Sequence, residues 1–220
     1  MNPLTIPPTH LDLIARLFKG GDQIITGITT DGLSMLHAAV GIATEAAELE
    51  MAVIGIRMSG FKLPSILHPK LDVENIIEEL GDHLFYEGAL RIVAGFVQLG
   101  DAELSMPASW AMPWSPPSCP YPDDALCNLI SMHSVLAGHI LDVIKKHVFY
   151  RKDLDRDKLR DLLLQDCWVV REMAGLLEID EDRLRELNIV KLERGPNARY
   201  KAGTYSDAAA QARADKKEGE

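Results

Sequence analysis

The sequence predicts an all-α protein of the four-helix-bundle type. Apolar residues recur at helical spacing along four long segments, and β-branched residues are scattered rather than alternating. A proline-rich stretch divides these segments into two pairs. The 220 residues, 47% hydrophobic and 25% charged, have the composition of an ordinary globular chain with room for one large domain.

The first pair of helices is expected before the proline-rich stretch. Residues 11–18 have helical spacing and end at two glycines, which favours a short helix. Leu33–Met58 has an uninterrupted apolar periodicity without proline and predicts a long helix. A second long helix is expected over Val73–Leu99, with Asp72 as its N-cap because an aspartate side chain accepts from the first free N–H groups.

The second pair of helices is expected after the proline-rich stretch. Residues 106–122 hold six of the twelve prolines and two tryptophans, which predicts a packed crossover without helix. Helical periodicity then covers Asp124–Tyr150 and residues 157–177. A shorter helix is expected to begin near Ile179 and to end at Leu192.

Charge and composition exclude several classes of partner. A net charge of −10 argues against binding to a nucleic-acid polymer, which usually needs a basic surface. Cys119, Cys127 and Cys167 fit no metal-ligand spacing and are expected to be reduced thiols of a cytoplasmic protein. The N-terminus has no signal-peptide pattern, and no apolar run approaches the ~20 residues of a membrane span, so we expect no membrane contact.

Two acidic pairs are the main candidates for chemistry. Glu45 and Glu48 are three residues apart in the first long helix, and Glu79 and Asp82 have the same spacing in the second. Residues three apart lie on one helix face, so antiparallel packing would bring all four carboxylates together. They would repel one another unless a cation lay between them, and oxygen ligands favour Mg²⁺ or Mn²⁺.

Each of these features also has a simpler structural interpretation. A single acidic pair is more often a solvated helix face, but two pairs on consecutive helices form a stronger signal. Gly81 costs a helix about 1 kcal/mol, so we expect it to permit a close helix approach. Glu50 and Glu78 are interpreted as solvated groups or as neighbours of the ligands, and His37 and His139 as structural residues.

The order of long helix, loop and long helix occurs twice, which predicts an internal repeat. An overlay that preserves the apolar phase keeps the packing faces and loses every carboxylate of the first half. Chance similarity between amphipathic helices is the alternative explanation. In this overlay Glu45, Glu48, Glu79 and Asp82 fall on Leu136, His139, Leu162 and Gln165, respectively.

The acidic motifs resemble those of the all-α nucleoside triphosphate pyrophosphohydrolase superfamily, in particular its MazG-like branch. That family is marked by E-x-x-E on one helix and E-x-x-D on the next, and the second motif commonly reads E-E-L-G-D. Residues 78–82 of this chain read Glu-Glu-Leu-Gly-Asp. Residues 36–39, Leu-His-Ala-Ala, resemble the usual approach to the first motif.

The second half resembles the same family through other residues. Residues 142–150 resemble the segment that follows the first motif in many members, and residues 188–194 resemble their C-terminal signature. The chain also departs from the family. The first half has no Lys-Lys-His-aromatic segment, the second half has none of the four acidic ligands, and Gly195 stands where an aromatic residue is usual.

The resemblance implies a tandem chain with one degenerate half, similar to the arrangement of the family's dimeric dUTPase branch. The second half would act as a built-in partner for the single metal site, and whole chains would pair as a homodimer. The expected organisation is one domain in four parts: a metal-binding half (10–105), a crossover (106–122), a degenerate half (123–200) and a flexible tail (201–220).

The resemblance also implies an activity, the Mg²⁺-dependent hydrolysis of a nucleoside or deoxynucleoside triphosphate to the monophosphate and pyrophosphate. Glu45, Glu48, Glu79 and Asp82 would be the metal ligands and catalytic residues, with Mn²⁺ as an alternative ion. The general base would be one of these four carboxylates or Glu78. Base and sugar preference do not follow from the sequence; Tyr86, His83 and Trp110 are the candidates for contact with the base.

Basic residues of the second half are candidates for phosphate contact. They stand out in an acidic chain, although cations also suit a solvated helix end because of the helix dipole. The main candidates are Lys145, Lys146, Arg151, Lys191 and Arg194, and Lys152 and Arg199 belong to the same two clusters.

Two other functions stay open. A catalytically degenerate member could serve as a nucleotide-binding or assembly module. The intact acidic motifs argue against this interpretation, and the missing Lys-Lys segment of the first half keeps it open. A purely structural scaffold would leave four inward carboxylates without a physical purpose.

Overall fold

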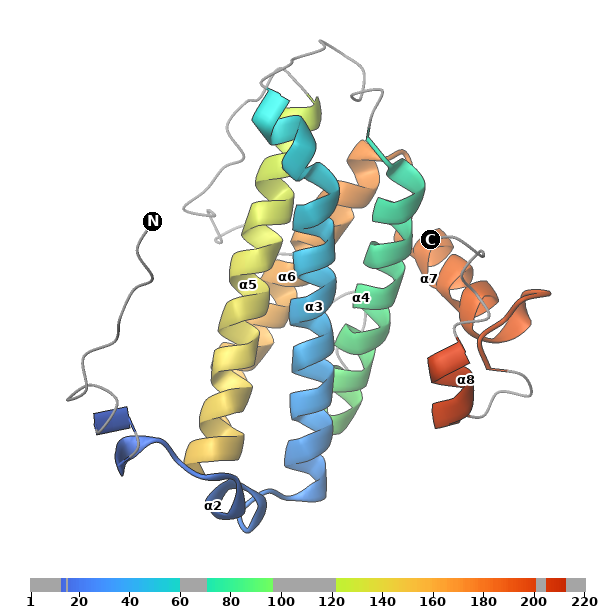
Figure 1. Ribbon diagram of the computed structural model, residues 1–220. Coiled ribbons are helices and arrows are strands. Elements are labelled where there is room, and N and C mark those ends of the chain that lie inside the picture. The colour runs from blue at the N-terminus through green and yellow to red at the C-terminus, as the bar shows by residue number, and fades with distance from the viewer. Residues whose placement is uncertain (1–12, 15, 60–70, 97–121, 201–204, 213–220) are drawn as a thin grey trace, which may run out of the picture.

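The computed structural model describes residues 13–14, 16–59, 71–96, 122–200 and 205–212. The regular elements in these ranges are all helices, which confirms the predicted all-α class (Figure 1). The predicted crossover up to residue 121, both of its tryptophans and Cys119 lie outside the described residues.

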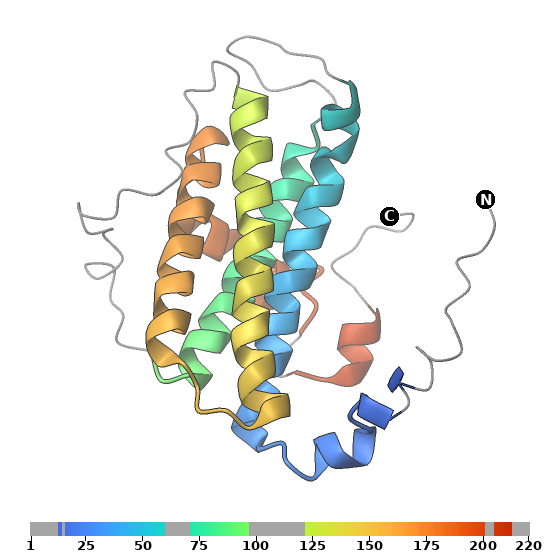
Figure 2. The same ribbon diagram turned by 90° about the vertical axis from the view of Figure 1, so that its left-hand side faces the viewer.

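Four long helices lie side by side and form the body of the molecule (Figures 1 and 2). Helix α3 packs against α4 and α5, α5 also packs against α6, and α4 and α6 share a smaller contact. Leucine and isoleucine side chains fill the space between them, including Ile42, Leu80, Ile140 and Leu163 with almost no exposed surface. The four helices are α3 (Thr30–Ser59), α4 (Val73–Val93), α5 (Pro122–Tyr150) and α6 (Arg156–Leu176).

The ends of α4 show which sequence signals act locally. The Asp72 side chain accepts a hydrogen bond from the Asn75 N–H at 3.0 Å, which confirms the predicted N-cap. The helix ends at Val93 instead of continuing to Leu99, because Gly95 has a φ of 73°. The Phe96 N–H then reaches back to a carbonyl of the last turn, a Schellman-type ending that glycine favours.

Helix α6 begins and ends in the same way as α4. Asp155 caps it by accepting from the Lys158 N–H at 3.1 Å, and Glu178 follows it with a φ of 56°. Under the predicted overlay of Glu79 on Leu162, Asp155 falls on Asp72 and Glu178 falls on Gly95. Two helices of the same length therefore begin and end alike in one register.

The burial pattern agrees with the same overlay. The buried positions of α3 and α4 compared below fall on buried positions of α5 and α6, as expected from an overlay that keeps the apolar phase, and the internal repeat stays a prediction. In α3, Met35, Ile42, Ala46, Leu49 and Val53 fall on Leu126, His133, Ala137, Ile140 and Ile144 of α5. In α4, Ile76, Leu80, His83 and Leu90 fall on Leu159, Leu163, Asp166 and Met173 of α6.

Shorter elements surround the bundle. Helix α2 (Gly21–Ile25) was not expected from the sequence and lies beneath the bundle in Figure 1. Helix α7 (Glu181–Ile189) packs on α4 and continues into the wider turn η1 (Val190–Arg194), where a single short helix was predicted. The predicted tail contains a short helix, α8 (Asp207–Ala212).

Helix α5 contains a segment, within Asp124–Tyr150, that is long and apolar enough to cross a membrane, which corrects the expectation that no such segment exists. An 18-residue window of this segment has a mean hydropathy of 1.3. Half of the apolar window is buried inside the protein, where α5 contacts α3 and α6. The core helix of a soluble bundle can have the same length and hydropathy, so this segment is only weak evidence for a membrane span.

Candidate metal centre

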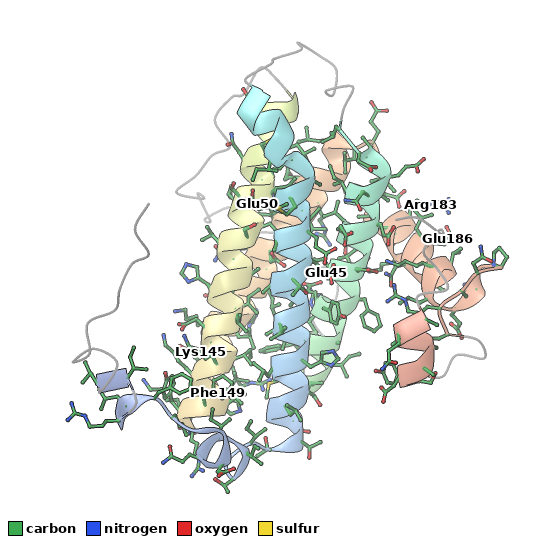
Figure 3. All side chains as sticks on the ribbon, viewed as in Figure 1. Glu45, Glu50, Lys145, Phe149, Arg183 and Glu186 are labelled. Atoms are coloured by element: carbon green, nitrogen blue, oxygen red, sulfur yellow. The ribbon has the colours of Figure 1, made fainter. Side chains whose placement is uncertain are left out.

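An acidic cavity of about 90 Å³ lies where α3 and α4 face each other. All four predicted carboxylate ligands line this cavity, so the structure brings the two motifs together as expected. Figure 3 shows Glu45 at the border between α3 and α4. The complete lining is Glu45, Glu48, Glu78, Glu79, Asp82, Tyr86 and Arg199.

Three of the carboxylates approach one another closely enough to share an ion. Oxygen atoms of Glu45, Glu48 and Glu79 lie within 4.8 Å of one another. Glu45 and Glu79 are only 8% and 4% exposed, whereas Glu48 is exposed. The cluster therefore has a buried floor and one side that opens to solvent.

The charges of this cluster shift its protonation. Burial, a hydrogen bond with Glu79 and the charges of the neighbouring carboxylates raise the pKa of Glu45 to about 8. Burial also raises the pKa of Glu79, with further increases from the charges of Glu48 and Asp82, although the hydrogen bond from Glu45 opposes the shift. At neutral pH Glu45 thus keeps its proton and donates a hydrogen bond to Glu79.

The proton on Glu45 helps to test whether these residues suit a divalent cation. A carboxyl group that stays protonated among like charges is one that a cation can stabilise in its ionised form. The donor atoms are oxygens alone, which suits Mg²⁺ or Mn²⁺ better than softer metals. The set of residues therefore fits such an ion.

Asp82 is held by two residues from outside the bundle. Asn188 Nδ2 donates to its Oδ1 and Lys191 Nζ donates to its Oδ2, both at 2.6 Å. Lys191 Nζ also donates to Glu78 Oε1 at 2.6 Å, and the lysine side chain is only 13% exposed. Both α7 and η1 are thereby tied to the acidic face of α4.

Gly81 permits this attachment. A Cβ atom at Gly81 would lie 3.3 Å from the Asn188 Cβ and 3.5 Å from the Leu184 carbonyl oxygen. Any larger residue would push α7 away from α4. The close helix approach predicted at Gly81 is therefore observed, and its partner is α7.

The predicted phosphate-binding residues separate into two groups. Figure 3 shows Lys145 on α5, away from Glu45. Lys145 is partly exposed and Lys146 is exposed, and they form ion pairs with Asp142 at 2.7 and 2.5 Å, respectively. The Arg151 guanidinium lies against Gly27, next to α2. These three residues and the exposed Arg194 do not line the acidic cavity.

Two of the predicted phosphate-contact residues reach the cavity. Lys191 contacts it through hydrogen bonds to Glu78 and Asp82. Arg199 lines it directly. Backbone hydrogen bonds from Arg199 N to Lys191 O and from Tyr200 N to Leu192 O fold this segment back along η1. No local spacing in the sequence signals this return.

The candidates for contact with the base lie in different parts of the structure. Tyr86 lines the acidic cavity, four residues after Asp82 and hence on the same face of α4. His83 is fully buried in the bundle and does not line the cavity, which corrects its assignment. His37 and His139, interpreted as structural residues, are not buried, and His37 makes an edge contact with Tyr86.

Tyr86 is positioned by a glycine on the facing helix. A Cβ atom at Gly41 would lie 2.3 Å from the Tyr86 ring. We therefore expect Gly41→Ala to displace the ring and to lower the free energy of unfolding by about 1–3 kcal/mol, as overpacking does. Thermal denaturation would measure the change.

The matched control for this substitution is Gly138→Ala on α5, where nothing lies within 4 Å of the added methyl group. Alanine has the higher helix propensity, so this variant should gain up to about 1 kcal/mol. Shifts of the same sign in both variants would contradict the proposed contact between Gly41 and Tyr86.

These features define an all-α helical-bundle protein with a carboxylate-rich cavity that suits a divalent cation. No family model matches the chain, and no curated protein or solved structure matches it.

Proposed function

We propose that the chain is a Mg²⁺-dependent nucleoside triphosphate pyrophosphohydrolase, which cleaves a nucleoside or deoxynucleoside triphosphate to the monophosphate and pyrophosphate. The observation that carries the proposal is the convergence of the four motif carboxylates on one cavity. The resemblance of both motifs to those of the MazG-like branch supports the same reaction.

Glu45, Glu48, Glu79 and Asp82 would hold the ion. When bound, Mg²⁺ would offset charge on the triphosphate and lower the pKa of a bound water. One of these four carboxylates, or Glu78 beside them, would accept the proton from that water.

Cations at the cavity supply the phosphate-binding side. Arg199 lines the cavity, and Lys191 contacts Glu78 and Asp82 in its lining. A guanidinium can bind two phosphate oxygens at once, whereas a lysine acts as a point charge. Of the basic residues that the sequence proposed for phosphate contact, these two are therefore retained, and Lys145 and Lys146 are not.

The direct test is a pyrophosphate-release screen across the canonical and modified nucleoside triphosphates, with and without Mg²⁺ or Mn²⁺. Release of pyrophosphate and monophosphate from at least one substrate, dependent on the cation, is the expected result. If no substrate releases pyrophosphate with either ion, the proposed activity is wrong.

The alternative is a nucleotide-binding or assembly module without catalysis. One observation favours it, because both oxygens of Asp82 already accept hydrogen bonds from Asn188 and Lys191. Stabilisation by Mg²⁺ and nucleotide without pyrophosphate release would identify such a module. A scaffold without a metal site would show no Mg²⁺-dependent change in Tm.

A homodimer of chains and a cytoplasmic location belong to the same proposal. Sedimentation analysis of the purified chain would test the dimer. A monomer at all concentrations would contradict that part of the proposal and leave the activity unaffected.

The protonation of Glu45 predicts a dependence of stability on pH in the absence of divalent cations. Its pKa is about 8 in the folded chain against 4.5 for an ordinary glutamate, so the folded state binds more protons between these values. The contribution of Glu45 to stability therefore falls as pH rises through this window. Denaturation with chelator present, at a series of pH values, would measure the slope.

Glu45→Gln provides the control for the pH experiment. The amide cannot ionise, so this part of the slope should disappear in the variant. Saturating Mg²⁺ should also reduce the slope in the original chain, since the cation stabilises the ionised cluster. An equal slope in the original chain and the variant would show that Glu45 does not carry the effect.

A further inference from the structure

A second cluster of titratable side chains lies inside the bundle. His83 of α4, His133 of α5 and Asp166 of α6 meet there, and none of the three has exposed side-chain surface. His133 Nδ1 lies 2.7 Å from Asp166 Oδ1, and His83 Nε2 lies 2.8 Å from Asp166 Oδ2. The two imidazole rings are almost perpendicular, with centroids 4.3 Å apart.

The cluster has unmet hydrogen-bonding capacity. His83 Nε2 and Asp166 Oδ2 are close, but their orientation does not make a hydrogen bond, and both atoms are without one among the described residues. His83 Nδ1 and His133 Nε2 are likewise buried without a partner in the described part of the chain. Buried polar atoms normally have partners, so the cluster points to a group that the side chains do not supply.

The neighbouring charged groups do not supply it. Arg91 Nη2 donates to Glu87 Oε1 at 2.6 Å, so these two charges on α4 neutralise each other. The Cys167 thiol, next to Asp166 in the chain, donates to Glu87 Oε1 at 2.7 Å. His83, His133 and Asp166 are therefore left as a separate set.

Asp166 is fully buried between the two imidazoles. Its Oδ1 and Oδ2 atoms lie 2.7 and 2.8 Å from nitrogen atoms of His133 and His83, respectively. A buried carboxylate beside two imidazoles is a common combination of metal ligands, because burial favours compensation of the charge.

We propose that His83, His133 and Asp166 form a second metal site, for a transition-metal ion of the Zn²⁺ type. His83 Nε2, His133 Nδ1 and the two carboxylate oxygens of Asp166 provide four donor atoms. One donor atom from each of the three residues can be chosen so that all lie within 4.8 Å of one another. Zn²⁺ lies about 2.0–2.2 Å from such nitrogen and oxygen ligands, a geometry that these separations allow with small adjustments.

The choice of ion follows from the ligands and the burial. Imidazole nitrogen favours Zn²⁺ and its neighbours over Mg²⁺, which prefers oxygen. The three side chains have no exposed surface, so the site has no open position for substrate and belongs to the closed, structural type. The ion would bind during folding and would be distinct from one in the acidic cavity.

The site would join the two halves of the repeat. His83 comes from the first half, whereas His133 and Asp166 come from the second. In the repeat register Asp166 falls on His83 and His133 falls on Ile42, so all three ligands belong to one layer where the halves meet. An ion there would oppose separation of the halves.

The test begins with the metal content of the full chain. The protein is unfolded in denaturant with chelator, refolded with Zn²⁺ or Co²⁺, and freed of unbound metal. We expect one ion per chain to be retained, visible absorption bands of nitrogen- and oxygen-bound Co²⁺, and a Tm roughly 5–10 °C above that of the metal-free chain. Failure to retain either ion would overturn the proposal, whatever else fills the cluster.

Variants separate this site from the acidic cavity. Glu48→Gln combined with Asp82→Asn should retain the Zn²⁺ or Co²⁺, whereas His133→Ile, which introduces the residue found at the equivalent Ile42, should lose it. Retention by His133→Ile at the level of the unchanged chain would contradict the assignment. If His133→Ile does not refold, Asp166→Asn applies the same criterion, and the metal content of the unchanged chain already decides the matter.

Discussion

Glu48→Gln should reduce Mg²⁺-dependent pyrophosphate release by about a hundredfold or more, which corresponds to ~3 kcal/mol or more of lost transition-state stabilisation. The substitution removes one negative ligand from a cluster in which Glu45, Glu48 and Glu79 approach within 4.8 Å. Because Glu48 is exposed, the neutral amide should leave the fold intact. Initial rates at saturating Mg²⁺, with a circular dichroism spectrum of the variant, would measure the effect.

Asp82→Asn and Glu74→Gln complete this experiment. Asp82→Asn removes a carboxylate from the other helix of the same cavity and should cause a comparable loss. Glu74→Gln makes the same chemical change on α4 at an exposed position outside the cavity, so its rate should be unchanged. Retained activity in both Glu48→Gln and Asp82→Asn would rule out this cavity as the active site.

Lys191→Met should lower the stability of the metal-free chain by about 2 kcal/mol, or about 4–8 °C in Tm for a chain of this size. Lys191 is 13% exposed and neutralises Glu78 and Asp82, which would be left close together without a cation. Mg²⁺ should therefore raise the Tm of the variant more than that of the original chain. Thermal denaturation with chelator and with Mg²⁺ would compare the two.

Lys145→Met is the matched control, because both lysines are sequence-based candidates for phosphate contact. Lys145 is partly exposed on α5 and is paired with Asp142. Its replacement should change neither the response to Mg²⁺ nor the KM for the triphosphate, whereas Lys191→Met should raise the KM by about tenfold or more through a lost charge-assisted contact. A higher KM for Lys145→Met with no change for Lys191→Met would assign phosphate contact to Lys145 instead of Lys191.

Local signals in the sequence were enough for most of the fold. The apolar periodicity predicted four long helices, and Asp72 marked the start of α4, because caps and helix faces depend on residues within one or two turns. The end of α4 was placed too late, since the apolar pattern continues past Gly95 while the backbone turns there. The overlay of the two halves also came from periodicity, and the buried positions of the bundle follow the same apolar phase.

The two acidic pairs could be recognised in the sequence because each has its spacing within a single helix turn. Their convergence required α3 to pack on α4. The basic residues of the site were named only as members of a larger set of candidates, and the sequence could not tell which of them reach the cavity. Lys191 reaches Asp82 because α7 docks closely on Gly81, and Arg199 reaches the cavity because the chain folds back along η1.

The buried cluster of two histidines and an aspartate shows most clearly which features the sequence predicts and which depend on packing. His83, His133 and Asp166 are far apart in the sequence and sit in apolar stripes where each resembles an isolated core residue. Periodicity along the chain indicates which residues face inward, because it reports the direction of a side chain from its own helix. Which inward residues from different helices meet depends on the register and packing of the helices, and that is a property of the assembled bundle.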